Sequence, residues 1–214
     1  MNRASARPLR RRDEARALFR NAILDAAEAV FAERGFHGAR IQDIAAHARI
    51  AVGTVYNHFE QKDDVLTALL EERTEEMLAL LRATDRAPTF EAHLRARIAR
   101  LLTYVEEHRA FFAVATEHGL FAGTAAPGAP ATTKRLRRVE KFRAAFAALV
   151  EEGIAADALE PIGADVLARF LGGTIRAFVL SSLSEEDSDV QAHAATIVDL
   201  FLRGAARRRG KRAR

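Results

Sequence analysis

The sequence predicts an all-α protein of about nine helices, with an N-terminal domain of three helices followed by a C-terminal helical domain. Helix-forming residues dominate, and apolar residues recur at the three- and four-residue spacing of amphipathic helices. No run of four or more β-branched or aromatic residues alternates with polar ones, as it would in a half-buried strand. Short connections between the expected helices are typical of an α-helical bundle.

The N-terminal part is expected to contain one long helix and two short ones. The long helix extends from about Asp13 to Arg34, and Gly35 stands where glycine commonly ends a helix. The two short helices are expected at about 42–48 and 52–59. These short helices are followed by longer ones from near residue 65, which indicates a domain boundary there.

The C-terminal part is expected to consist of longer helices, several with a clear apolar stripe. Gly153 is predicted to cap one of them, and a loop rich in Gly, Ala and Pro is expected after His118. The expected helices span about 62–84, 89–107, 109–118, 132–152, 164–183 and 185–203.

The charge of the chain is divided unevenly along its length. The net charge is +4, but residues 1–20 carry +5, residues 203–214 carry +7, and the segment between them is acidic. Basic termini on an acidic central segment indicate arms that bind a polyanion. The alternative is that the termini are simply solvated. The predicted organisation is a flexible basic arm (1–12), a domain of three helices (13–65), a larger helical domain (66–203) and a basic tail (204–214).

Composition excludes several classes of function. The 214 residues include no cysteine, which excludes disulfides, thiol catalysis and cysteine-bound metals. No segment has the pattern of a secretory signal, and the longest uncharged stretch is broken by prolines, so we expect a cytoplasmic protein without a membrane partner. Glu-x-x-His, His-Glu-x-x-His and Gly-x-Ser-x-Gly motifs are absent. We therefore expect no enzyme activity, metal or cofactor.

The segment 41–59 has the proportions of a helix-turn-helix, two short helices joined by a turn of about three residues. Ile44 and Val55 are placed to pack between the two helices, and Phe59 is placed to turn inward. The outward-facing residues of the second helix are then Val52, Gly53, Thr54, Tyr56, Asn57 and His58.

A helix of this width fits the major groove of DNA, with its first residues nearest the base edges. Thr54, Tyr56 and His58 have hydrogen-bonding groups that can hold phosphate oxygens and so fix the register of the helix. Gly53 permits close approach of the backbone. Lys62 adds a cation at the start of the next helix, whose N-terminus already favours anions.

Residues of about 20–70 resemble the DNA-binding domain of the TetR/AcrR family of transcriptional regulators. The resemblance is carried by ILDAA (23–27), FAERGF (31–36), IA (44–45), TVYNHF (54–59) and KDDVL (62–66). It implies a homodimer that binds double-stranded DNA at a palindromic operator, typically as a repressor, and that a small-molecule effector releases. It places Thr54, Tyr56, His58 and Lys62 at phosphates and Val52 and Gly53 near bases.

The segment departs from the family pattern at three places. Arg49 replaces the usual glycine of the turn, where a non-glycine residue in a left-handed conformation costs roughly 1 kcal/mol. Ala51 replaces the usual hydroxyl cap, which contributes ~1 kcal/mol. Ala39 and Arg40 replace hydroxyl residues ahead of the first short helix. We expect Arg40, Gln42 and Arg49 to contact the DNA backbone.

By the same resemblance, the last two long helices form the dimer interface and the effector binds among the helices before them. Gly172 and Gly173 are interpreted as a site of close helix approach at the dimer seam, with packing inside one chain as the alternative. Arg176 needs an acceptor from the partner chain or from a ligand. The interface is predicted at Phe170, Gly172, Gly173, Phe178, Ile197 and Phe201. The effector pocket is predicted at His93, Arg97, Tyr104, Phe111, Phe112, His118, Phe142, Phe146 and Phe170.

Two other functions remain open on the sequence alone. The basic tails would suit a protein that coats nucleic acid without sequence preference. A helical-bundle enzyme is the third hypothesis, although Asp43 and His47, spaced i, i+4, are better explained as a surface pair within the helix-turn-helix. Sequence preference in DNA binding separates the regulator from the coating protein.

Overall fold

The computed structural model describes residues 6–83, 87–117, 133–161, 163–184 and 190–205, and these residues form helices joined by short connections. The all-α prediction is confirmed within these ranges. The N-terminal elements are α1 (Ala6–Gly38), α2 (Ile41–His47) and α3 (Val52–Tyr56). The others are α4 (Lys62–Arg82), α5 (Phe90–Glu107), α6 (Arg109–Glu117), α7 (Thr133–Ala155), α8 (Ala164–Ser184) and α9 (Val190–Ala205).

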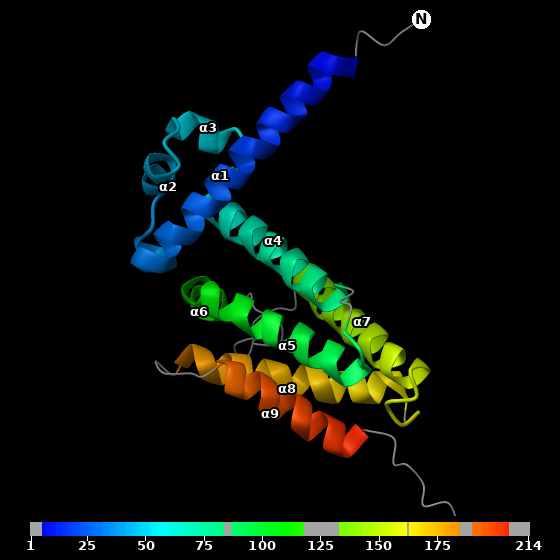
Figure 1. Cartoon of the computed structure of the whole chain (residues 1–214). Helices are drawn as coiled ribbons and strands as arrows, with labels where there is room; N and C mark the ends of the chain where they lie inside the picture. The colour runs from blue at the N-terminus through cyan, green and yellow to red at the C-terminus, as the bar shows by residue number, and fades with distance from the viewer. Residues whose placement is uncertain (1–5, 84–86, 118–132, 162, 185–189, 206–214) are drawn as a thin grey trace, which may run out of the picture.

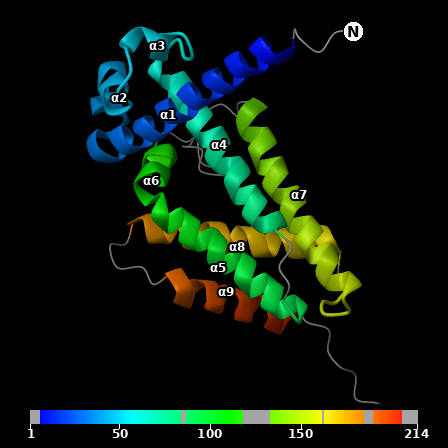
Figure 2. The ribbon, with the colours of Figure 1, turned by 45° about the horizontal axis from the view of Figure 1, so that its top comes forward.

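The helices divide into an N-terminal group and a larger bundle, joined by α4. Helices α2 and α3 pack beside α1 at one end of the molecule, and α8 and α9 lie at the other end (Figures 1 and 2). Helix α4 starts next to the N-terminal group and extends into the bundle, where it packs against α5 and α7. Helix α1 also packs against α4 and α6, so the group rests on the bundle through two helices.

The core of the N-terminal group follows the apolar positions of the sequence. Ile23 and Phe31 of α1, Ile44 of α2 and Val55 of α3 are each completely buried. Phe59 is 7% exposed and turns into the same core, as predicted. Burying these side chains against one another holds two helices that are too short to be stable in isolation.

Several helix ends have identifiable caps. Thr89 accepts a hydrogen bond from the Ala92 amide at 3.2 Å and begins α5. The Arg40 amide donates to the Asp43 carboxylate at the start of α2 (3.0 Å), and the Gln61 amide does the same to Asp64 at the start of α4 (3.1 Å). These bonds satisfy amides that would otherwise lie unpaired at a helix end.

Two helix boundaries differ from the prediction. Helix α1 begins by Ala6, so residues 6–12 are helical and continue the long helix N-terminally of its predicted start at Asp13. Gly35 has a φ of 66° and ends the regular part of α1, as predicted. Gly153 does not end α7, which continues to Ala155, because the chain leaves this helix through the left-handed Asp157 (φ 59°) instead.

Candidate functional site

The turn between α2 and α3 has the backbone conformation that the sequence predicts. Arg49 has a φ of 56°, in the left-handed region that usually takes glycine. The amide of Ile50 then donates to the Ala45 carbonyl at 3.0 Å and closes the turn. Ala51 precedes α3 in extended conformation and offers no side-chain cap, as expected for alanine. The turn fixes the angle at which α3 leaves α2.

Helix α3 and its flanks expose most of the residues that were predicted to contact DNA. Gly53 and Asn57 are exposed, and Tyr56 is 50% exposed although it is a large aromatic residue. Val52, Thr54 and His58 are half-buried at the edges of this face. Arg40, Gln42 and Arg49 are exposed on and beside α2. We call the surface formed by these nine residues the α3 face.

The α1 helix adds positive charge beside the α3 face. Burial, followed by the charges of Arg16 and Arg20, lowers the pKa of His58 from its usual value. Arg16 and Arg20 are therefore close enough to His58 to disfavour its protonated form. A polyanion that met the α3 face would meet the two arginines as well.

Lys62 differs from its predicted role. Its ammonium donates to the carbonyls of Phe36 (2.5 Å) and Ala39 (2.8 Å) and lies 4.4 Å from the centre of the Phe36 ring. These contacts tie the start of α4 to the end of α1. The side chain is thus committed to carbonyls of its own domain, and the prediction that it binds a phosphate is not supported by this geometry.

The bundle contains a cavity of about 410 Å³ between α4, α5, α7 and α8. This volume lies in the range of small-molecule sites in proteins. Most of the lining is apolar, and the charged lining residues are three arginines. The lining residues are Met77, Leu101, Val105, Val139, Phe142, Arg143, Phe146, Ala168, Arg169, Gly172, Gly173, Ile175, Arg176 and Val179.

Of the predicted pocket residues, Phe142 and Phe146 line this cavity and the other described ones do not. Phe111 and Phe112 are buried in the core, at 1% and 0% exposure. Phe170 is 55% exposed on the outer side of α8. His118 lies outside the described residues. The sequence offered little to identify most of the lining, because Met77, Leu101 and Val105 look like ordinary core positions.

The polar residues predicted for the pocket have structural roles instead. The His93 ring accepts a hydrogen bond from the Ala87 amide at 2.8 Å. Arg97 is 1% exposed, and its guanidinium donates to the Ala83 carbonyl (2.8 Å) and the Glu152 carboxylate (2.7 Å). It therefore joins the middle of α5 to the ends of α4 and α7. Because each of these groups is satisfied within the chain, their placement in the effector pocket is corrected.

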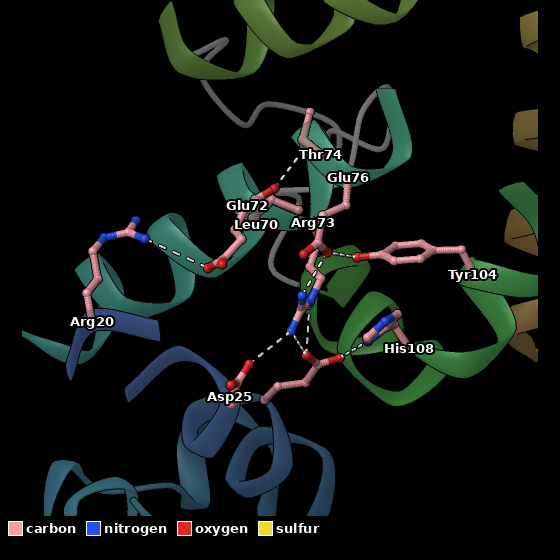
Figure 3. A network of polar contacts seen from close by, with 10 residues as sticks. Arg20, Asp25, Leu70, Glu72, Arg73, Thr74, Glu76, Tyr104 and His108 are labelled. Carbon is pink, nitrogen blue, oxygen red and sulfur yellow. Dashed lines mark hydrogen bonds and ion pairs between the residues drawn. The ribbon is translucent and has the colours of Figure 1, made fainter. Parts of the chain in front are cut away.

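Tyr104, the remaining predicted pocket residue, belongs to a polar network that joins α1 to the bundle (Figure 3). Arg73 of α4 donates to Glu28 of α1 (2.5 and 2.9 Å) and to Glu76 (2.7 Å). Glu28 also contacts His108 at the end of α5, and Tyr104 donates to Glu76. Burial raises the pKa of Glu76, but the hydrogen bonds from Tyr104 and Arg73 outweigh it and leave this pKa below its usual value. Arg73 is thus held in its charged form by paired carboxylates.

The outer side of α8 and α9 exposes apolar side chains that a lone chain would leave in water. Val166 is 59% exposed, Phe170 55% and Leu200 51%. We call this surface the α8–α9 face. Of the residues predicted for the dimer interface, Ile197 and Phe201 are 0% and 1% exposed, so they pack inside the chain and do not belong to this face. Phe170 stacks on Phe201 from outside, with ring centres 6.3 Å apart, and the half-buried Phe178 contacts His193 of α9.

The two adjacent glycines of α8 have different surroundings. A Cβ atom on Gly172 would lie 2.9 Å from the Phe146 ring of α7, so the geometry favours packing inside one chain over the dimer seam. A Cβ on Gly173 would meet no atom within 4 Å. Each glycine costs about 1 kcal/mol of helix stability relative to alanine, and only the first has a packing contact that requires it.

Among the described helices, α8 is the one that is long and apolar enough to cross a membrane, over Ala164–Leu183, by length and composition only. About a third (33%) of that window is buried. One side of α8 packs against α7 and α9, as a bundle helix does, and its apolar outer side belongs to the α8–α9 face. Within the described ranges, no three His, Asp or Glu side chains come together as metal ligands would.

Comparison with known proteins places the α3 face in a recognised domain. Residues 23–69 match the family model described as bacterial regulatory proteins, tetR family. The "Fatty acid metabolism regulator protein" of Bacillus subtilis is 43% identical over 51 residues, which are 24% of this chain and 26% of that protein. The matched segments span 26% to 39% of the curated relatives' length.

Solved structures share the fold over most of the chain. The fatty acid degradation regulator FadR of Bacillus halodurans is similar with a TM-score of 0.70 at 23% identity, covering 92% of this chain and 97% of that one. FadR of Bacillus subtilis, solved in complex with stearoyl-CoA, has a TM-score of 0.66 at 23% identity, covering 86% and 97%. At this identity the likeness establishes the fold.

Proposed function

We propose that this chain, which belongs to the tetR family of bacterial regulatory proteins, is a transcriptional repressor that a small molecule releases from DNA. It binds a palindromic operator as a homodimer, in the cytoplasm, through two copies of the α3 face. The effector occupies the cavity between α4, α5, α7 and α8. The family assignment rests on the match at 23–69 and on the shared fold.

The observation that carries DNA binding is the exposure of Tyr56, Asn57 and Gly53 on a short helix that leaves a fixed turn. A large aromatic residue held half in water costs apolar burial, which a partner surface would recover. Its hydroxyl can donate to a phosphate, and Gly53 lets the backbone approach a base edge. Arg16 and Arg20 supply the positive field beside them.

Dimerisation through the α8–α9 face is supported by the exposed Val166, Phe170 and Leu200. Paired with the same face of a second copy, these side chains would leave water in a two-fold symmetric interface. A two-fold dimer presents two α3 faces, and a palindrome presents two matching half-sites.

Effector control is supported by the path of α4. This helix starts at the end of the N-terminal group and carries Met77 at the wall of the cavity. Arg73, one turn earlier, is bonded to Glu28 of α1. A ligand that displaced α4 would therefore move α1 and the α3 face with it. The complex of Bacillus subtilis FadR with stearoyl-CoA supports ligand binding in this fold.

The test is selection of bound duplexes from a random pool by the purified full chain. The expected result is enrichment of one palindromic sequence, preferred over random DNA by ~10³-fold or more. Tyr56→Ala serves as the paired variant and should weaken binding by a similar factor on every duplex. Equal recovery of all sequences would reject the regulator and favour a coating protein.

A further inference from the structure

The cavity between α4, α5, α7 and α8 combines an apolar interior with a cationic rim. We propose that its ligand is an amphipathic anion, with an apolar body among the buried side chains and an anionic group bound by Arg176. This inference rests on the proposed function, since it takes the cavity as the effector site, and it adds the chemical class of the effector.

The interior of the cavity selects an apolar body. Phe142 and Phe146 of α7, Leu101 and Val105 of α5 and Met77 of α4 form its walls. No carboxylate is among the described lining residues. The volume of about 410 Å³ corresponds to roughly 14 water-sized groups, which fits a chain of about ten carbons with a small head group.

The three arginines of the lining are not equivalent. Arg143 donates to Glu140 (2.9 Å) and Asp165 (2.8 Å), and Arg169 is paired with Asp165 at 2.7 Å. No hydrogen bond or ion pair joins Arg176 to another described residue. Arg176 is therefore the lining arginine whose charge is left for a ligand.

The glycine pair leaves room for the anionic group beside this charge. Gly172 and Arg176 are four residues apart, so they lie one turn from each other on the same side of α8. Gly173 also lines the cavity, and a Cβ there would meet nothing within 4 Å. A carboxylate or phosphate in this space can accept the paired N–H groups of the guanidinium.

Charge complementarity also excludes the opposite class of ligand. A cationic amphiphile would fit the apolar walls equally well, but its charged group would meet the guanidinium of Arg176, which has no carboxylate partner among the described residues. A neutral amphiphile could accept a hydrogen bond from Arg176 but would lose the ion pair with it. The anionic form is thus preferred over both at equal apolar size.

The test is calorimetric titration of the full chain with decanoate, decanol and decanoyl-CoA, below the concentrations at which they form micelles. Decanoate or decanoyl-CoA should bind at least about tenfold more tightly than decanol, as expected for one charge-assisted hydrogen bond. Tighter binding of decanoate would identify a free acid as the ligand type, and tighter binding of decanoyl-CoA a phosphate-bearing ester. Equal affinity for decanol and both anions, or binding of none of the three, would overturn the proposal.

Variants then locate the anionic group. Arg176→Gln should lose about tenfold in affinity for the anionic probe and nothing for decanol, whereas Arg176→Lys should retain part of the preference. Arg203→Gln, an exposed arginine of α9 outside the cavity, is the matched control and should match the parent chain. An unchanged anion preference in Arg176→Gln would overturn the assignment, and a loss of dimer instead would show that Arg176 pairs with a second copy.

Duplex binding is measured on the same samples without decanoate, decanol or decanoyl-CoA. It separates failure of the proposed ligand class from failure of the proposed function. Retained operator binding together with no anion preference would reject the ligand class alone. Loss of both would reject the proposed function, because the α3 face itself would then not act on DNA.

Discussion

Arg49 and Asp157 are the two described non-glycine residues with a left-handed backbone, at φ angles of 56° and 59°. Such a conformation costs a residue with a side chain about 1–2 kcal/mol. Asp157 ends α7, where an acid can stabilise the turn locally. Arg49 is an exposed cation in the turn before α3. Binding of the Arg49 side chain to the DNA backbone would offset the free-energy cost of its left-handed conformation.

Replacing Arg49 by glycine should separate these two effects. We expect Arg49→Gly to raise the melting temperature by about 2–4 °C, the shift that ~1 kcal/mol produces at this size. Duplex affinity should fall, and the slope of log K against log salt should decrease by about 1. Asp157→Gly is the matched control, with a similar thermal effect and unchanged DNA binding. Unchanged DNA affinity in Arg49→Gly would remove this residue from the interface.

His58 should make DNA binding depend on pH. In the free protein, burial and the charges of Arg16 and Arg20 lower its pKa, so it is neutral at pH 7. Phosphates beside it would favour the imidazolium, so a proton is taken up on binding and affinity increases as pH falls through the pKa of the imidazole in the complex. In the unbound chain the lowered pKa has the reverse effect, since stability present above pH 6.5 is lost at lower pH.

The measurement for His58 is duplex affinity between pH 5.5 and 8, with His58→Gln as the comparison. The parent chain should bind more tightly at the acid end, and the variant should follow a flatter profile. Identical profiles would show that this imidazole stays neutral in the complex and does not contact a phosphate.

For single residues, the sequence predicts backbone conformation better than it predicts hydrogen-bond partners. The left-handed backbone of Arg49, expected from the family resemblance, and the inward turn of Phe59, expected from the local pattern, are both present. The contacts of Lys62 could not be foreseen, because its carbonyl acceptors belong to the end of α1, more than 20 residues away. Distant acceptors decide whether a charged side chain is free for DNA.

Helix α7 illustrates what decides the length of an element. A glycine near the end of an apolar pattern predicts a cap, yet Gly153 is inside the helix and buried. A Cβ at this position would lie 2.5 Å from Phe90 and 2.6 Å from Leu159. Glycine is therefore present because two other elements approach closely, which no local pattern records. In α9 likewise, Phe201 lies against Phe170 of α8, and α5 also packs against this helix, so burial in α9 depends on distant elements.

Gly153→Ala should therefore destabilise the fold even though alanine favours helices. We expect a loss of about 1–3 kcal/mol in the free energy of unfolding, as for other overpacked cores. Gly204→Ala in α9 is the control, because its Cβ would meet nothing within 4 Å. That variant should gain up to about 1 kcal/mol from helix propensity. Denaturant titration measures both, and a stabilised Gly153→Ala would contradict the close packing.

In the whole molecule, α4 connects the N-terminal group to the wall of the cavity. Arg73 bonds Glu28 of α1, and Met77 lines the cavity one turn later. Glu28 also reaches His108 at the end of α5. The order of the helices that makes this connection could be predicted from the apolar pattern of the sequence. The network itself could not be predicted, since it joins residues up to 80 positions apart.

The proposed assembly of two chains depends on the α8–α9 face. Phe170→Glu places a charge at its centre and should convert the dimer to monomer in sedimentation experiments, with weaker operator binding as a consequence. Leu136→Glu is the control, since Leu136 is 57% exposed on α7, away from this face. A Phe170→Glu variant that stayed dimeric would move the interface elsewhere.

Paired binding to DNA can be measured as the distance between two α3 faces on one duplex. The chain contains no cysteine, so Ala51→Cys, at the exposed start of α3, gives a single attachment point for a spin label. On the selected operator, pulsed electron resonance should give one narrow distance close to 35 Å, the spacing of successive major grooves on one side of DNA. No measurable distance, or one that matches neither a helical turn nor its multiples, would contradict paired entry of the α3 faces into the groove.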